Sequence, residues 1–206
     1  MTKAAYTTQK IFFAFGAVCT LTVFGGNCLN ALDRAKARVL EIAGKVGSAK
    51  NPAITLMARG YAADETKRIL KLSGVQEALI TIGEAVVNIG SVRRIGLQDP
   101  FGAAGEHFSY VDVSDKAVIS AGLYRKGFEE HCGSRRHDGA GLAGLTLIGD
   151  NAVELSALCN TAAGLSVGDA TELLNDSGVE GILVTRSQEV SATDGLCKRP
   201  THRQAA

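Results

Sequence analysis

Two side chains of this 206-residue chain have the type and the surroundings to do chemistry, His137 and Arg59. His137 follows Arg135 and Arg136 and could act as a general base toward a hydroxyl, because imidazole titrates near neutral pH. The plainer alternative is a solvated loop histidine, whose basicity the neighbouring cations would lower. Arg59 stands near the start of an expected helix, where a guanidinium and free N–H groups suit a pyrophosphate. Its plainer alternative is a solvated arginine at a helix start.

The hydrophobic pattern predicts the elements that must position these residues. We expect a strand from Phe12 to Phe24, a helix from Leu29 to Ile42, a loop over 44–52 and a second helix from Ala62 to Leu72 that ends at Gly74. Further strands are expected at 77–82, 86–89, 92–97, 110–113, 118–120, 142–148 and 181–185, and further helices at 153–165 and 170–174. Hairpin-like strands mixed with helices indicate an α+β fold rather than a doubly wound parallel sheet.

Composition narrows the class of protein. With 46% apolar residues, 21% charged residues and a formal net charge of +1, the chain is typical of a folded domain without a strong electric field. This excludes composition-driven binding to nucleic acid or to anionic membranes and favours small-molecule or protein partners. We expect one domain over residues 1–197 and a solvated tail over 198–206. The five cysteines form no C-x-x-C pair, which predicts reduced, mostly buried thiols.

The N-terminal region allows two interpretations. The apolar run from Ile11 to Val23 follows Lys3 and Lys10, as in a secretory signal, but Gly16 and two threonines interrupt it. The run is too short to span a bilayer, so no transmembrane segment is expected. We predict a buried strand and a cytoplasmic protein, with export as the alternative if residues 1–23 act as a signal.

Four short segments, in order, carry a resemblance to a known family. They are Ala58-Arg59-Gly60-Tyr61-Ala62-Ala63-Asp64-Glu65, Ile80-Thr81-Ile82-Gly83, Gly96-Leu97-Gln98-Asp99-Pro100 and Ser120-Ala121-Gly122-Leu123-Tyr124. This order resembles the ApbE family, the FAD:protein FMN transferases. The resemblance implies an α+β, T-fold-related domain of mixed or antiparallel sheets with packed helices. A long middle stretch of the family has no counterpart near residues 52–54, so we expect part of the flavin pocket to be missing.

The resemblance also implies a set of site residues. His137 matches the catalytic position, and the cofactor-binding candidates are Arg59, Gly60, Gly83, Gln98, Asp99, Ser120 and Gly122. Gly83-Glu84-Ala85 replaces the family's turn of two glycines followed by asparagine or aspartate, and a carboxylate where the backbone should approach the flavin disfavours tight binding. Asp138 has an uncertain correspondence.

The magnesium site that the resemblance implies is altered. Without a gap, Ser156 and Asn160 occupy the positions of the family's two metal ligands, and with a shift of one residue Ala157 and Thr161 do. The metal candidates are therefore Ser156, Asn160 and Thr161. Neither alignment keeps the family's carboxylate, and magnesium prefers anionic oxygen ligands, so we expect a weak site.

By resemblance, the function is a magnesium-dependent transfer of FMN from FAD to a threonine or serine of a carrier flavoprotein. The alternative is a noncatalytic member that binds flavin or has kept only the scaffold. A third possibility is an FAD pyrophosphatase that releases free FMN and AMP.

Overall fold

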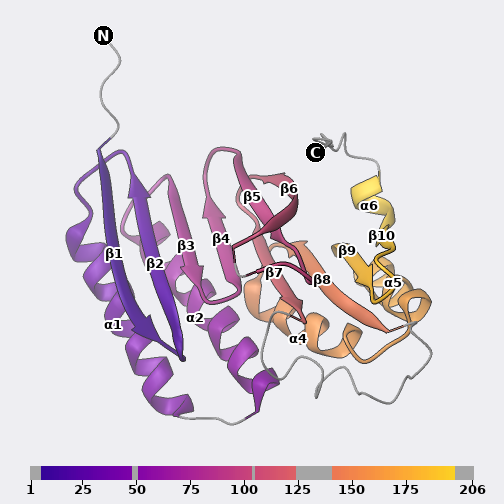
Figure 1. Ribbon diagram of the computed structural model, residues 1–206. Helices are drawn as coiled ribbons and strands as arrows, with labels where there is room; N and C mark the ends of the chain where they lie inside the picture. The colour runs from indigo at the N-terminus through magenta and orange to yellow at the C-terminus, as the bar shows by residue number, and fades with distance from the viewer. Residues whose placement is uncertain (1–5, 48–50, 104, 124–140, 198–206) are drawn as a thin grey trace.

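The computed structural model describes residues 6–47, 51–103, 105–123 and 141–197, and its architecture is α+β, as predicted. One eight-stranded sheet runs through the molecule in the order β1-β2-β3-β4-β7-β8-β9-β10, and neighbouring strands pair antiparallel throughout (Figure 1). Its strands are β1 Thr7–Ala14, β2 Ala17–Phe24, β3 Ala78–Ile82, β4 Ala85–Ile89, β7 Ala117–Gly122, β8 Leu142–Gly149, β9 Glu180–Thr185 and β10 Val190–Ala192. A separate hairpin consists of β5 Arg93–Gln98 and β6 His107–Val113.

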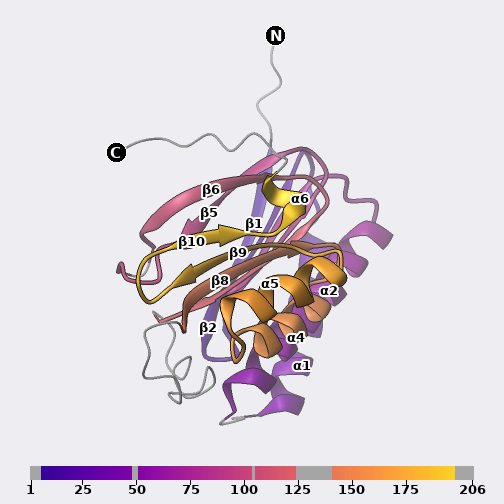
Figure 2. The same ribbon diagram turned by 90° about the vertical axis from the view of Figure 1, so that its right-hand side faces the viewer.

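The helices are α1 Leu29–Val46, α2 Pro52–Leu72, α4 Ala152–Ala162, α5 Val167–Asp176 and the short α6 Asp194–Cys197. Figure 2 shows α1, α2, α4 and α5 on one side of the large sheet and the β5–β6 hairpin on the other. Register explains the main core: Leu21 pairs with Ile80, and Ile80 pairs with Val87, so fully buried apolar side chains form a row across the face that the helices cover. This core continues through both α2 and α4.

The second core lies between the hairpin and the opposite face of the sheet. Leu97 and Val111 of the hairpin pack with Val118, Ile148 and Ile182 of the sheet. Strands β7, β8 and β9 are therefore apolar on both faces, which explains their continuous apolar runs.

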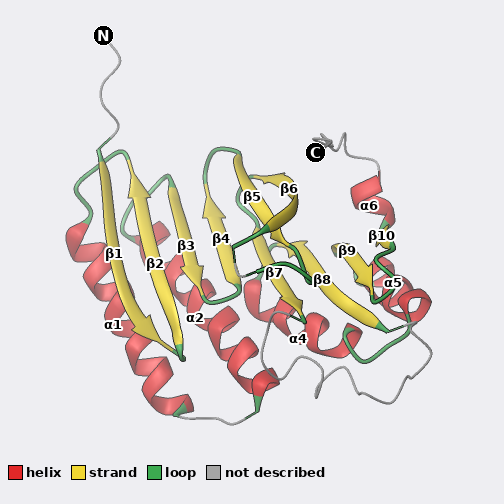
Figure 3. Cartoon of the chain, in the orientation of Figure 1, coloured by secondary structure: helices red, strands yellow, loops and turns green. Residues whose placement is uncertain are grey.

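The N-terminal region differs from the prediction. Residues 12–24 are not one strand: β1 and β2 form a hairpin whose turn lies at Phe15 and Gly16, both with positive φ, 53° and 71° (Figure 3). The apolar, β-branched pattern continues on both sides of the turn, and Gly16 is the only conventional turn residue in it. The single-strand prediction was therefore wrong.

Helix α2 begins ten residues earlier than predicted. The Asn51 side chain accepts a hydrogen bond from the Ala53 amide at 2.9 Å, and Pro52 occupies the first turn, both of which favour a helix start. Arg59 consequently lies inside the helix rather than before it. The sequence also gave no prediction for β10 and α6, which are only three and four residues long. The other elements lie within a few residues of their predicted bounds.

Among the described residues, no helix has the length and apolar character needed to cross a membrane. Residues 198–206, predicted to be a solvated tail, lie outside the described part of the chain.

Candidate functional site

Several predicted site residues meet at one end of the large sheet. The β1–β2 turn, the β3–β4 turn and the last residues of β7 all lie at this end because these strands run antiparallel to one another. The Ser120 amide is 3.5 Å from the Glu84 carbonyl, which joins the β3–β4 turn to β7. Arg59 reaches the same end from α2.

Arg59 brings a buried charge to this end, because the residue is only 8% exposed. Its Nη2 donates to the Phe15 carbonyl at 2.7 Å, and its Nη1 forms an ion pair with the Glu84 carboxylate. Its Nε is buried without a hydrogen-bond acceptor in the described part of the chain. The arginine thus binds groups of its own chain at the place where the sequence suggested a ligand phosphate.

Gly83 is fitted closely against this arginine. It has a φ of +59°, which favours glycine, and a Cβ there would lie 2.8 Å from Cδ of Arg59. The glycine lets the turn carry Glu84 onto the guanidinium. Gly83 therefore positions the ion pair, whether or not it also contacts a ligand.

Arg59 also acts on a neighbouring thiol. Burial raises the pKa of Cys19, while its contact with the Ala14 carbonyl and the positive charge of Arg59 oppose that rise. Cys19 and Cys159 are buried and Cys28 is half-buried, and all three are free thiols, in agreement with the prediction. The protonated thiol of Cys19 is a core group rather than a nucleophile.

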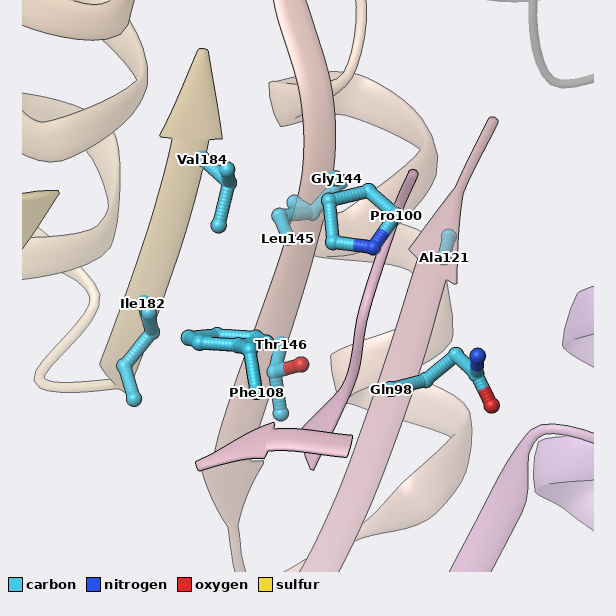
Figure 4. A pocket seen from close by; sticks show the side chains of 9 residues that line it. All are labelled: Gln98, Pro100, Phe108, Ala121, Gly144, Leu145, Thr146, Ile182 and Val184. Atoms are coloured by element: carbon cyan, nitrogen blue, oxygen red, sulfur yellow. The ribbon is translucent and has the colours of Figure 1, made fainter. Parts of the chain in front are cut away.

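A small hollow with room for about one water molecule lies between the β5–β6 hairpin and the sheet. Figure 4 shows the Phe108 ring between Ile182 and Thr146, with the Pro100 ring beside Gly144. Its walls are apolar except for the Gln98 amide and the Thr146 hydroxyl, and it is far smaller than pockets that enclose ligands, about 300–1,000 Å³. The hollow of this structure is therefore too small to receive a flavin ring.

Gln98 and Asp99 hold the connection that closes this hollow. The Gln98 amide donates to the Ala103 carbonyl at 2.9 Å and accepts from the Gly105 amide at 2.9 Å. The Asp99 carboxylate accepts from the Phe101 amide at 2.9 Å, as in an Asx turn. Both side chains therefore shape the loop at Pro100.

Ser120 and Gly122 lie on β7 next to the hollow. The hydroxyls of Ser120 and Thr146 are 2.9 Å apart, and Thr146 lines the hollow. Gly122 pairs with Gly144. A Cβ added to Gly144 would lie 3.0 Å from Cβ of Pro100. Ser120 and Gly122 thus lie toward the same end of the sheet as Gly83 and Arg59, while Gln98 and Asp99 belong to the hairpin that covers the face opposite the helices.

The remaining candidates lie on the α2–α4 contact. Ser156 is fully buried, and its hydroxyl donates to the Ala152 carbonyl at 2.7 Å. A Cβ on Gly60 would lie 2.6 Å from that carbonyl and closer still to the Ser156 hydroxyl, so the glycine permits the two helices to touch. Asn160 donates to the Ala53 carbonyl at 3.1 Å, and the exposed Thr161 donates to the Ala157 carbonyl at 3.1 Å.

The three candidate metal ligands, Ser156, Asn160 and Thr161, do not fit a magnesium ion. Ser156 faces a helix contact, and neither Asn160 nor Thr161 supplies a negative charge. Across the described ranges, no cluster of three or more His, Cys, Asp or Glu side chains could hold a metal ion. The three metal candidates remain predictions without a fitting site.

Asp64 is a residue whose role the sequence reasoning missed. Its two carboxylate oxygens accept from the amides of Ala152 and Val153, each at 2.9 Å, and so cap the N-terminus of α4 from α2. The signal was present, because Asp64 is the last residue of the Gly60-Tyr61-Ala62-Ala63-Asp64 motif. Gly60 and Asp64, one helical turn apart, thus both serve the α2–α4 contact.

His137 and Asp138 lie among residues 124–140, outside the described part of the chain. The role of His137 therefore stays a prediction.

Comparisons with known proteins show the family and the fold of the chain. Residues 31–183 match the sequence model of the ApbE family. A FAD:protein FMN transferase of Klebsiella pneumoniae is 33% identical over 81 residues, which are 39% of this chain and 25% of that protein. The match thus spans about a quarter of the length of this curated relative.

Solved structures show the same fold at low sequence identity. The ApbE protein of Thermotoga maritima superposes with a TM-score of 0.76 at 13% identity, covering 93% of this chain and 98% of that one. The apo flavinyl transferase ApbE of Pseudomonas stutzeri gives 0.72 at 13% identity, covering 93% and 96%. The flavin transferase ApbE of Vibrio cholerae gives 0.69 at 9% identity, covering 94% and 99%.

Proposed function

Because this chain belongs to the ApbE family, we propose that it uses FAD as a substrate and transfers FMN to a threonine or serine hydroxyl of a carrier flavoprotein. The observation that supports this most directly is the position of Arg59, whose buried guanidinium lies at the end of the sheet where β7 carries Ser120 and Gly122. A buried guanidinium at such a place suits a ligand that carries phosphates.

The proposed reaction is a phosphoryl transfer. The carrier hydroxyl oxygen forms a bond to the phosphorus of the FMN half, the bond from that phosphorus to the bridging oxygen breaks, and AMP leaves with the bridging oxygen. We assign His137 the role of base that takes the hydroxyl proton. Arg59 would neutralise charge that develops on the phosphates. No step is assigned to magnesium, because the candidate ligands do not fit it.

A noncatalytic role is the second candidate, and one observation favours it. The group best suited to a pyrophosphate, Arg59, is already paired with Glu84, and Ser156 is fully buried. A chain with these features could bind flavin weakly or serve as a scaffold without transfer.

Incubation with FAD, magnesium and a carrier domain distinguishes these functions. The transferase predicts covalent flavin fluorescence on the carrier band in a denaturing gel, and His137→Ala should abolish it. Free FMN and AMP without a labelled carrier would instead indicate a pyrophosphatase. Neither product, with FAD still raising the melting temperature, would indicate a noncatalytic flavin-binding protein. The cytoplasmic location and the alternative of export stay predictions.

A further inference from the structure

We infer that Glu84 sets the affinity of this end of the sheet for phosphate, because its carboxylate occupies the place on Arg59 that a phosphate oxygen would take. The inference rests on the proposed function only in giving Arg59 a phosphate-bearing ligand. It adds a residue of this chain that determines how strongly such a ligand is held.

The first argument is the bonding of the guanidinium. A carboxylate is planar and a phosphate is tetrahedral, but both carry anionic oxygens that accept hydrogen bonds from a guanidinium. One group can therefore replace the other on Arg59. Glu84 takes Nη1 and the Phe15 carbonyl takes Nη2, while Nε is buried without an acceptor in the described chain. Buried donors without acceptors are uncommon, so the environment of Arg59 has capacity for one more oxygen.

The second argument is the position of Glu84 relative to solvent. The side chain of Glu84 is 17% exposed and that of Arg59 is 9% exposed, so the carboxylate is the more accessible member of this largely buried pair. Glu84 belongs to a β3–β4 turn that Gly83 permits through its φ of +59°. An anion that approaches Arg59 from solvent therefore meets a tethered negative charge first.

The third argument concerns competition. A carboxylate held on the same chain acts at a high effective concentration, so a free anion must displace it and also overcome its repulsion. Glu84→Gln removes this charge and keeps the shape of the side chain. We therefore expect the variant to bind phosphate at Arg59 more tightly than the wild type does.

The test uses inorganic pyrophosphate and four proteins at constant ionic strength: the wild type, Glu84→Gln, Glu77→Gln and Arg59→Gln/Glu84→Gln. The dissociation constant is measured by titration calorimetry and by the rise in melting temperature. We expect Glu84→Gln to bind pyrophosphate at least tenfold more tightly than the wild type. Glu77→Gln is the matched control, because Glu77 pairs with Arg93 at 3.1 Å, and Arg93 also has a buried Nε without an acceptor among the described residues.

The outcomes separate a phosphate-controlling residue from a merely structural ion pair. The inference is supported if Glu84→Gln binds pyrophosphate more tightly while Glu77→Gln does not, and if the double variant Arg59→Gln/Glu84→Gln loses the added affinity. Equal affinity in wild type and Glu84→Gln, or an equal gain in Glu77→Gln, overturns it.

If Glu84→Gln fails to fold, Glu84→Asp carries the test. It keeps the charge but shortens the side chain by one methylene, so affinity above the wild-type value supports the inference and an unchanged value overturns it. Neither flavin nor carrier is present, so this test can fail or succeed independently of the transferase assay.

Discussion

At the scale of single residues, the Arg59–Glu84 pair is the interaction with the largest expected effect on stability. Both groups are largely buried, and removal of one partner leaves a charge without its counter-charge. Glu84→Gln should therefore lower the free energy of unfolding by about 3 kcal/mol, measured by urea denaturation in a buffer without multivalent anions.

The control for this prediction is a double-mutant cycle. Arg59→Gln/Glu84→Gln should be less destabilised than the sum of the two single variants, because it leaves no buried unpaired charge. A loss below about 0.5 kcal/mol in Glu84→Gln, as for an exposed pair, would contradict the prediction.

Asp64 gives a second prediction at this scale. Asp64→Ala removes the acceptor for the Ala152 and Val153 amides and should cost about 1–2 kcal/mol of stability. Asp64→Asn keeps one oxygen acceptor and should cost less. Hydrogen exchange checks the mechanism: the two amides should lose protection in Asp64→Ala, and retained protection would disprove the capping role.

Motifs in the sequence select candidate residues of the site but not the groups that those residues contact. Arg59, Gln98 and Ser120 could be selected from their motifs, and their roles stay predictions. The partner of Arg59 could not be selected, because the pairing depends on a glycine turn that directs Glu84 back onto α2. Asp64 was missed for a similar reason, since its partners lie 88 and 89 residues away in the chain.

At the scale of elements, the closest contact is that of α2 with α4 at Gly60. A methyl group there would collide with the Ala152 carbonyl and the Ser156 hydroxyl. Gly60→Ala should therefore destabilise the protein by about 1–3 kcal/mol through overpacking, measured by thermal and urea unfolding.

Gly44→Ala is the matched control for Gly60→Ala. Gly44 lies in α1, is exposed and has no atom within 4 Å of an added Cβ. The higher helix propensity of alanine should make this variant more stable, by up to about 1 kcal/mol. Destabilisation of both variants alike would show that the α2–α4 contact is not the cause.

Helix α1 carries a prediction on pH. Lys45, and then Arg38, lower the pKa of Glu41 to about 2, from an ordinary value of 4.5. The carboxylate is preferred in the folded state, so its contribution to stability is present above pH 4.5 and is lost as the pH falls from 4.5 through 2. Carboxyl NMR titration checks the value. Lys45→Ala should raise the pKa of Glu41, and high salt should do the same.

The pattern of elements was largely predictable because most helices and strands have a clear apolar period. The β1–β2 turn was not predictable, because strand-like residues continue through it. Phe15 adopts a positive φ there, which is uncommon for a phenylalanine. The start of α2 was missed although Asn51 and Pro52 mark it, because the apolar residues Ile54 and Met57 of its first two turns are exposed and do not follow the buried face of the later turns.

At the scale of the whole molecule, the sheet and its helices form one core, and Cys19 lies within it at 0% exposure. A variant that retains only Cys19, with the other cysteines changed to alanine, should react with a thiol reagent through opening of that core. A variant that retains only the half-buried Cys28 should react on the order of a thousandfold faster. Similar rates in mild conditions would show that the β1–β2 hairpin opens separately.

The short connection between α1 and α2 has a practical consequence. Helix α1 ends at Val46 and α2 begins at Pro52, so only five residues separate the two helices. A sequence inserted between Gly47 and Asn51 lies between two helices and would leave every strand pairing of the sheet intact. The connection between α1 and α2 is therefore a suitable site for inserting a reporter sequence.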